Sequence, residues 1–355
     1  MLKLHRRDFI RTSLFGGIAA ATIPAYAMKV LEEQTKITVN ANSQVSLVTG
    51  NNRAEMAFNA LKPFSKEIAQ AVGNRQIIVK PNMVEVHIPL CATHKDTIEG
   101  ILEFYKSINK LQNVVIAESV ANGKSMTGYD NYGYIPVAEK YKVKLLDLDE
   151  LPYQMHYVMD ERDFIPKPIR ISSLLADRKN FVMSAARMKT HGTVVATLTF
   201  KNLAFGCPLK VWGTSEQGTP RVISHGKQTL HGNGLRAVNY NMYNLAYHVR
   251  PDLGLVDGYE GMEGNGPTKG TPIDHKVCIA GLDWMSVERV GLKLMDINPE
   301  NIGYLKFCSD AGMGQFDLDK IEIIGEPLAR HIKTYKLPNN VERLYIWKTP
   351  IERRS

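Results

Sequence analysis

The sequence contains no closely spaced cysteines, because the four that it has, Cys91, Cys207, Cys278 and Cys308, lie far apart. Without a C-x-x-C pair, an iron–sulfur cluster or a structural zinc site built on clustered thiolates is disfavoured. In an oxidising compartment four cysteines allow one or two disulfides, in three different pairings. Four buried free thiols are the equal alternative.

Long apolar runs and clusters of basic residues are also missing. Beyond its N-terminus the chain has no apolar run of transmembrane length, so we expect no stable membrane span. The formal net charge of +8 comes from 44 basic and 36 acidic residues, and the lysines are scattered. We therefore expect no nucleic-acid partner. An apolar share of 44% and a charged share of 23% are ordinary for a soluble globular protein.

The N-terminus carries a recognisable export pattern. The pair Arg6 and Arg7 precedes a weakly apolar run over residues 14–23, and a small-x-small cleavage site ends at Ala27. This order is typical of a signal read by the twin-arginine translocase. We expect residues 1–27 to be a signal peptide and the mature chain to lie in the periplasm or cell envelope. An uncleaved anchor or a chance basic N-terminus is the alternative.

Strand-like and helical segments alternate along the rest of the chain. Helical spacing of apolar residues predicts a helix over residues 53–72. Apolar runs at residues 76–80, 113–117 and 144–147 predict buried strands, with helical spacing between them. This rhythm predicts an α/β fold with a mostly parallel sheet flanked by helices, as a single domain over residues 45–325 followed by a tail over 326–355. An inserted subdomain is the alternative. In such sheets functional groups gather at the carboxyl ends of the strands, which here carry Lys80-Pro81-Asn82 and Glu118.

Glycine-rich stretches predict loops between these elements. Residues 122–134 and 208–233 are rich in glycine and polar residues, and loops as long as the second are usually functional or poorly ordered. Between them, residues 154–159 and 168–172 are compatible with a hairpin, and Thr93 has the position of a helix N-cap.

Three lysines stand beside polar residues just after apolar runs. The pairs are Lys80 with Asn82, Lys189 with His191, and Lys201 with Asn202. A lysine at a strand end supplies a point charge for a carboxylate or phosphate, and a neighbouring asparagine can orient that group. Together the pairs predict binding of a small anionic ligand. For any one lysine, exposure at the edge of the sheet is the simpler interpretation.

A glycine-rich segment, residues 257–267, follows a predicted strand and holds Asp257, Glu260 and Glu263. Glycine lets the backbone turn sharply and approach a ligand, and the carboxylates can hold a magnesium or calcium ion or act as a general base. No Gly-Lys-Ser/Thr follows the segment and it lacks the G-x-G-x-x-G pattern, so it is neither a phosphate loop nor a dinucleotide fingerprint. A turn-rich loop whose acids cap backbone amides is the alternative.

Histidines add a third signal. His191, His225 and His231 lie in the glycine-rich middle of the chain, and each can carry a proton or bind a metal. No H-x-H or H-x-x-x-H spacing links them, so a metal site using His225 and His231 needs ligands from distant segments. Taken singly, each is compatible with a structural or surface histidine. No G-x-S-x-G nucleophile elbow supports a serine hydrolase.

Four motifs occur in one order along the chain. They read Ile78-Val79-Lys80-Pro81-Asn82, Met188-Lys189-Thr190-His191, Phe200-Lys201-Asn202 and Glu263-Gly264-Asn265-Gly266-Pro267. In this order they resemble the uncharacterised family called domain of unknown function 362, over roughly residues 45–325. Many members of that family carry a ferredoxin-like module with clustered cysteines. This chain lacks the module, so their iron–sulfur label does not transfer.

These features predict an exported α/β enzyme that moves protons on a small anionic substrate, as an epimerase or lyase does. Lys80, Lys189 and Lys201 would bind the anion, and Asn82 and Asn202 would orient it. His191 and one of the acids Asp257, Glu260 and Glu263 would transfer protons, and a divalent metal can assist them. A non-catalytic binding or accessory protein for a cofactor or redox system is the alternative.

Overall fold

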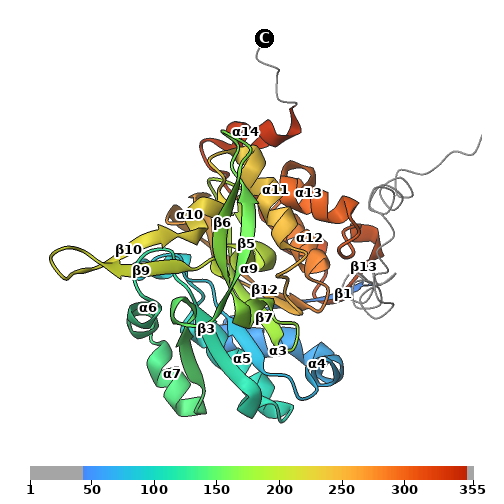
Figure 1. Ribbon diagram of the computed structural model, residues 1–355. Helices are drawn as coiled ribbons and strands as arrows, with labels where there is room; N and C mark the ends of the chain where they lie inside the picture. The colour runs from blue at the N-terminus through green and yellow to red at the C-terminus, as the bar shows by residue number, and fades with distance from the viewer. Residues whose placement is uncertain (1–42, 350–355) are drawn as a thin grey trace, which may run out of the picture. The chain divides into compact units, whose positions relative to one another are not determined.

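The central sheet is built from strands that run mostly in the same direction (Figure 1). The computed structural model describes residues 43–349, so the predicted signal peptide and the last six residues of the tail lie outside the described residues. The parallel strands at the centre are β4 (Lys144–Asp147), β3 (Val114–Glu118), β2 (Ile77–Lys80), β7 (Phe181–His191) and β11 (Leu253–Asn265). Beyond β11 the sheet continues with β12 (Lys269–Gly281), which is antiparallel to β11, and then with β1 (Ser43–Thr49) and β13 (Ile321–Gly325). The short β8 (Val195–Thr197) pairs with β7. Within the described residues the order β13-β1-β12-β11-β7-β2-β3-β4 forms one sheet.

The strands at the centre of the sheet are buried on both faces. Every residue of β2, β3 and β7 is buried, which explains why β2 and β3 appear in the sequence as continuous apolar runs. Parallel pairing sets Ile77 of β2 opposite Val114 of β3 and Phe181 of β7. The predicted α/β fold with a mostly parallel sheet is confirmed.

Helices cover both faces of this sheet. On one face α3 (Arg53–Leu61), α4 (Ser65–Val72), α5 (Lys95–Ser107) and α7 (Tyr134–Tyr141) share one buried apolar cluster with β2, β3 and β7. On the other face α9 (Thr199–Gly206) packs against β7 and α12 (Trp284–Leu294) against β11 and β12, with α11 (Leu235–Leu245) and α13 (Gly303–Asp310) packed together nearby. Ser184 points to this second face, because its Oγ donates to Thr199 O at 2.7 Å.

Two helix boundaries differ from the sequence prediction. The helix expected over residues 53–72 is divided by a 3-10 turn at Lys62–Phe64, where Pro63 has no N–H to donate. The N-cap of α5 is His94, whose Nδ1 accepts from Asp96 N at 3.2 Å, and not Thr93. The Thr93 hydroxyl instead accepts from Asn82 N and donates to Ala185 O, both at 2.8 Å. It thereby links the end of β2 to β7.

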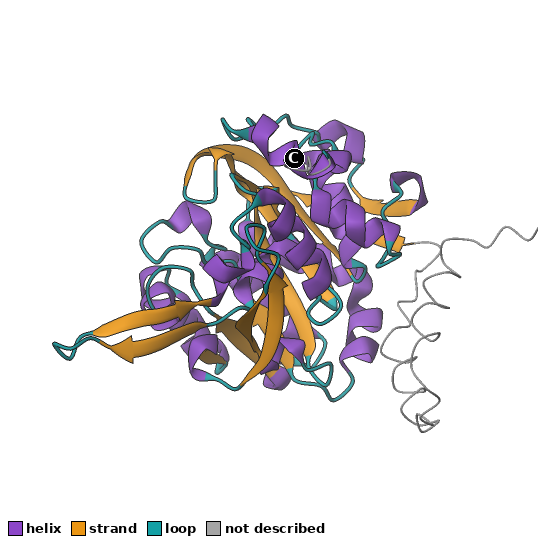
Figure 2. Cartoon of the chain, turned by 45° about the horizontal axis from the view of Figure 1, so that its top comes forward, coloured by secondary structure: helices purple, strands orange, loops and turns teal. Residues whose placement is uncertain are grey.

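The glycine-rich stretch over residues 208–233 is not the loop that its composition predicts. It holds the hairpin of β9 (Lys210–Thr214) and β10 (Pro220–His225), followed by α10 (Gly226–Leu230). Most hairpin side chains are exposed or half-buried, so no buried apolar alternation marks these strands in the sequence. Figure 2 shows the hairpin projecting from the body of the structure. Similarly, α6 (Ser125–Asn131) replaces the loop expected over residues 122–134.

The acidic segment after Val256 is also a strand and not a loop. It continues β11 as far as Asn265, paired with β12 along one edge, with a bulge between Gly258 and Glu260. On the other edge Met262 pairs with Lys189 of β7. Pairing on both edges makes up for the low strand propensity of the three glycines between Asp257 and Asn265.

The remaining elements include the predicted hairpin, formed by β5 (Tyr153–Met159) and β6 (Pro166–Ser172), which leads into α8 (Ser173–Ala176). The described tail carries 3-10 turns and α14 (Val341–Leu344). All four cysteines are buried free thiols, which is one of the two alternatives that the sequence left open. Across residues 43–349 no helix combines the length and the apolar character that crossing a membrane requires.

Candidate functional site

A cavity of about 250 Å³ lies at the carboxyl ends of β2 and β3, with the end of β7, α9 and α10 around it. We call it the lysine cavity, after Lys80, Lys201 and Lys227 in its lining. Seven predicted site residues line it: Lys80, Asn82, His191, Lys201, Asn202, His225 and His231. Neighbouring parallel strands end at the same edge of a sheet, which explains why residues distant in sequence meet here.

A buried ion pair forms the floor of the lysine cavity. Lys80 Nζ lies 2.8 Å from both carboxylate oxygens of Glu118, and each side chain is 1% exposed. Burial lowers the pKa of Lys80 and raises the pKa of Glu118, and the attraction between the two charges opposes both shifts. Lys80 Nζ also donates to Pro81 O and Asn202 Oδ1, and Ser119 N donates to Glu118 Oε1. These bonds favour the charged pair.

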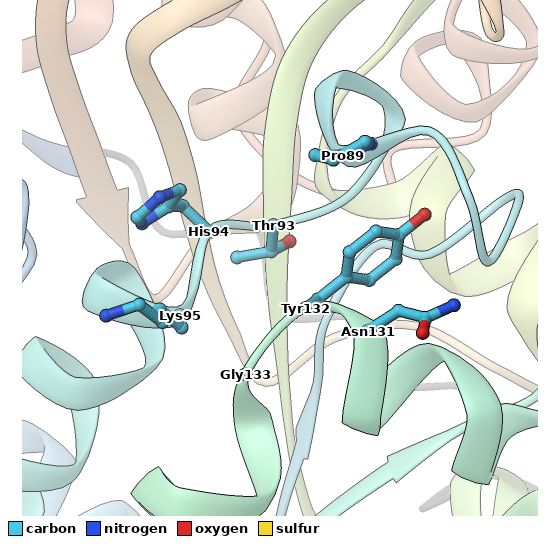
Figure 3. A pocket seen from close by; sticks show the side chains of 7 residues that line it. All are labelled: Pro89, Thr93, His94, Lys95, Asn131, Tyr132 and Gly133. Carbon is cyan, nitrogen blue, oxygen red and sulfur yellow. The ribbon is translucent and has the colours of Figure 1, made fainter.

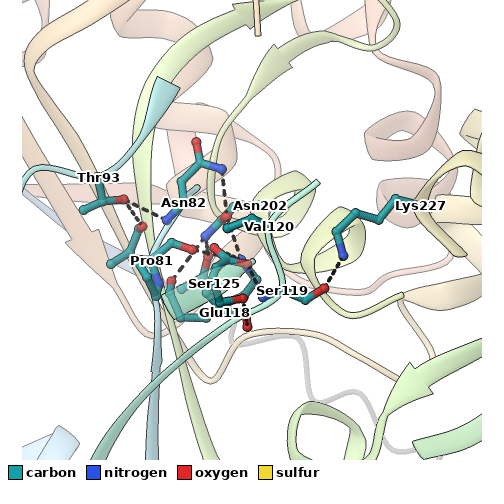
Figure 4. Close-up of polar contacts among 12 residues, drawn as sticks. Pro81, Asn82, Thr93, Glu118, Ser119, Val120, Ser125, Asn202 and Lys227 are labelled. Atoms are coloured by element: carbon teal, nitrogen blue, oxygen red, sulfur yellow. Dashed lines mark hydrogen bonds and ion pairs between the residues drawn. The ribbon is translucent and has the colours of Figure 1, made fainter. Parts of the chain in front are cut away.

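The two predicted asparagines belong to the same network (Figure 4). Asn202 Oδ1 accepts from Asn82 Nδ2 at 3.0 Å and from Lys80 Nζ at 3.2 Å, and Asn202 Nδ2 donates to Ser184 Oγ at 3.0 Å. Asn82 Oδ1 is buried and accepts no hydrogen bond from the described residues. Asn82 therefore offers a free acceptor next to the cavity.

Gly206 leaves the space in which Lys80 lies. A Cβ atom at position 206 would stand 1.7 Å from Lys80 Cε and 2.4 Å from Lys80 Nζ. Because the Lys80 side chain is buried and tied to Glu118, it cannot move aside without losing that ion pair. Glycine at the end of α9 is thus a requirement of the network.

Lys201 and Lys227 differ in how they are bound. Lys227 Nζ donates to Ser119 Oγ at 2.7 Å and to Pro208 O at 2.6 Å, and burial lowers the pKa of Lys227 to about 8. Lys201 Nζ lies 4.7 Å from the centre of the Phe205 ring and makes no hydrogen bond or ion pair with any described residue. Burial, with Lys189 and Lys80 nearby, holds the pKa of Lys201 well below its usual range.

Burial lowers the pKa of each of the three histidines of the cavity, which favours the neutral ring. His191 Nδ1 accepts from Thr193 N at 3.1 Å, so in the neutral ring Nε2 carries the hydrogen. His225 Nε2 donates to Ala121 O at 3.0 Å and His231 Nδ1 to Lys227 O at 2.8 Å. His191 therefore offers a donor, whereas His225 Nδ1 and His231 Nε2 keep free lone pairs.

Glu118, Ser119 and Lys227 are cavity residues that the predicted site omitted. Glu118 had a usable signal, because it stands at the carboxyl end of a predicted strand. Lys227 had none, since it belongs to α10 inside a stretch whose composition indicates a loop.

The structure does not bring the other predicted residues to the lysine cavity. Lys189 is fully buried, and its Nζ donates to Cys91 O at 2.7 Å. Asp257 accepts from Thr97 Oγ1 at 2.7 Å and lies 3.5 Å from Arg53 Nε. Glu260 lies 3.3 Å from Arg187, and Glu263 accepts from Lys336 N at 2.9 Å. Each of these three acids thus has a partner in the protein.

A second cavity, of about 310 Å³, lies beside the start of α5. Figure 3 shows Thr93 in its middle, His94 and Lys95 on one side and Tyr132 on the other. Lys95 is half-exposed and pairs with Asp96 at 3.1 Å. The predicted site residues do not line this cavity, so we place the candidate site in the lysine cavity.

The family model described as domain of unknown function (DUF362) matches residues 77–293, which include every residue that lines the lysine cavity. The chain belongs to this family. It is similar to a thylakoid-associated protein of Synechocystis, with 21% identity over 268 residues that cover 74% of this chain and 76% of that protein. A solved structure of a Thermotoga maritima protein aligns with 75% of this chain at 11% identity and a TM-score of 0.36. This chain spans 59% of that protein's length.

In this DUF362 chain, the donor groups at the lysine cavity do not form a metal site by themselves. His225 and His231 both line the cavity, each with one free nitrogen. Within residues 43–349, no group of three or more His, Cys, Asp or Glu side chains is arranged to hold a metal ion. Glu118, the carboxylate among the described lining residues, is already bound to Lys80.

Proposed function

We propose that this DUF362 protein is an enzyme that binds a small anionic substrate in the lysine cavity and moves a proton on it. The observation that carries the proposal is the balance of charged groups. Among the described lining residues are three lysines and one carboxylate, and Lys80 already pairs with that carboxylate. Lys227, whose pKa of about 8 keeps it mostly protonated at pH 7, pairs with no carboxylate of the cavity lining, and a buried cation without a counterion favours an anionic ligand.

The histidines supply the proton chemistry. A neutral imidazole with a free lone pair can take a proton from a substrate carbon or oxygen, and His231 Nε2 has that lone pair. His191 Nε2–H can donate a hydrogen bond to the substrate oxygen on which negative charge develops. Epimerisation and elimination both need such a base and donor.

We expect the purified protein to catalyse exchange of a carbon-bound proton in a small hydroxy or oxo acid. Lactate, malate and pyruvate in D₂O form the test panel, followed by proton NMR. His231→Asn keeps a donor for Lys227 O and removes the Nε2 base, so the exchange rate should fall about 100-fold or more. His87→Asn, at an exposed histidine outside the cavity, is the matched control and should exchange at the normal rate.

Two results would overturn this proposal. Equal exchange in His231→Asn and the unaltered protein would remove the histidine base from the reaction. A panel compound that raises the melting temperature without any proton exchange would favour the alternative function, a non-catalytic binding or accessory protein.

We also propose that the twin-arginine pair directs export of the folded chain to the periplasm or cell envelope. The support is the sequence pattern at residues 1–27, which ends at a small-x-small site. Changing Arg6 and Arg7 together to lysine should keep the protein in the cytoplasm, as measured by cell fractionation and immunoblotting. Arg11→Lys, with the pair intact, should be exported normally. Normal export of the double variant would contradict the assignment.

A further inference from the structure

Lys201 stands apart from the other buried lysines around the lysine cavity. Lys80 pairs with Glu118, Lys189 donates to Cys91 O, and Lys227 donates to Ser119 Oγ and Pro208 O. Lys201 has no such partner among the residues that the structure describes, although its side chain is buried and lines the cavity. Its environment is therefore one that disfavours an ammonium group.

The surroundings of Lys201 favour the free amine. Burial lowers the pKa of Lys201, and the cationic groups of Lys189 and Lys80 are close enough to lower it further. These effects outweigh the attraction of an ammonium group to the Phe205 ring face, which is the contact that Nζ makes. A desolvated lysine next to other cations is the usual form of an amine that attacks carbonyl carbon. A lysine that pairs with a carboxylate, as Lys80 does, is instead held in the protonated form, which has no lone pair for attack.

The geometry points to Lys201 as a nucleophile that forms an imine with the carbonyl group of a small oxo acid bound in the lysine cavity. This inference rests on the proposed function, since it uses the same cavity and the same proton carriers. It adds the substrate class, an acid that bears an aldehyde or ketone.

The step balances without any further reactant. The Lys201 Nζ lone pair forms the bond to the carbonyl carbon, and the carbonyl π electrons move to oxygen. Both hydrogens of the amine then leave with that oxygen as water, relayed by the imidazole of His231, and the C=N bond forms. Once protonated, the imine withdraws electrons from the neighbouring carbon, whose proton the same imidazole can then remove.

The cavity also has groups for the rest of such a substrate. Lys227 supplies a positive charge for the carboxylate, because its pKa of about 8 leaves the amine mostly protonated at pH 7. Asn82 Oδ1 and His225 Nδ1 are buried acceptors without partners in the described part of the chain, and they suit a hydroxyl donor. A hydroxylated oxo acid would thus satisfy more of the cavity than pyruvate.

The test is reductive trapping with borohydride. The purified protein is incubated with pyruvate or with hydroxypyruvate, reduced, digested and analysed by mass spectrometry. We expect Lys201 to gain the mass of the oxo acid less one oxygen atom, only when oxo acid and borohydride are both present. Lys201→Met should reduce the total label roughly tenfold or more, whereas Lys106→Met, at an exposed lysine, should be labelled normally.

The outcomes separate this inference from the proposed function on which it rests. Folding of Lys201→Met is checked by its melting curve, and mapping the label in the unaltered protein gives a result that does not depend on that variant. Proton exchange in the acid panel without label on Lys201 would overturn the imine and leave the proposed function standing. Absence of both exchange and label would overturn both.

Discussion

Replacing Glu118 with leucine is expected to lower the free energy of unfolding by about 3–5 kcal/mol, because it leaves the Lys80 ammonium buried without its counterion. Both side chains are 1% exposed, so water cannot take over the role of the carboxylate. Asn202 Oδ1 and Pro81 O still accept from Lys80 Nζ, but neither carries a charge. Urea unfolding of the purified protein measures the loss.

A double variant separates the lost pair from the lost packing. Glu118→Leu combined with Lys80→Met removes both charges, so it should recover a large part of the stability. The exposed pair of Lys306 and Asp310 is the matched control, and Asp310→Asn should change the unfolding free energy by about 0.5 kcal/mol or less. A Glu118→Leu loss no larger than that of Asp310→Asn would mean that Lys80 is not held as a buried cation.

The Glu288→Gln variant should remove a pH dependence of stability that this carboxyl group causes. Glu288 Oε1 accepts from Thr199 Oγ1 at 2.7 Å and from Phe200 N at 2.8 Å, and it thereby holds the start of α9, which carries Lys201. Burial raises the pKa of Glu288 to about 7 from an ordinary 4.5, so the folded state binds the proton more tightly than the unfolded chain. Its stabilising contribution is complete below pH 4.5 and is lost as the pH rises to 7.

Relative to Glu288→Gln, the unaltered protein should therefore lose about 2–3 kcal/mol of unfolding free energy between pH 5 and pH 8. Glutamine keeps an acceptor for Thr199 and Phe200 and does not titrate. Urea titrations at both pH values measure the difference. Glu139→Gln, at an exposed helix position, is the control and should follow the unaltered protein. If the unfolding free energy of Glu288→Gln changes with pH as much as that of the unaltered protein, the buried carboxyl group does not cause the pH dependence.

The fold was predictable where one apolar pattern accounts for one element. The strands β2 and β3 are apolar along their whole length because both faces are covered, and the sequence shows that directly. The second half of β11 was not predictable, because its glycines have no side chains that could alternate between buried and exposed faces. Pairing with β12 and β7 supplies the stability that the residues themselves lack.

The candidate site was predictable to a similar extent. Lys80, Lys201 and their neighbouring asparagines could be found, because each follows an apolar run at the edge of a predicted element. The acids Asp257, Glu260 and Glu263 stay outside the lysine cavity, since nearby partners elsewhere in the protein bind them. A position next to a strand end in the sequence does not show on which face of the sheet a side chain lies or which residue it contacts.

The sequence by itself predicted the α/β class and pointed to Lys80, Lys201 and their neighbouring asparagines, since hydrophobic periodicity and strand ends are local properties. It also contains the export pattern at residues 1–27, whose role stays a prediction. Only the tertiary structure decided which lysine has a counterion. Glu118 lies 38 positions from Lys80, and Ser119 lies 108 positions from Lys227. Whether a buried amine is paired or free depends on such distant neighbours, and these leave Lys201 without a partner among the described residues.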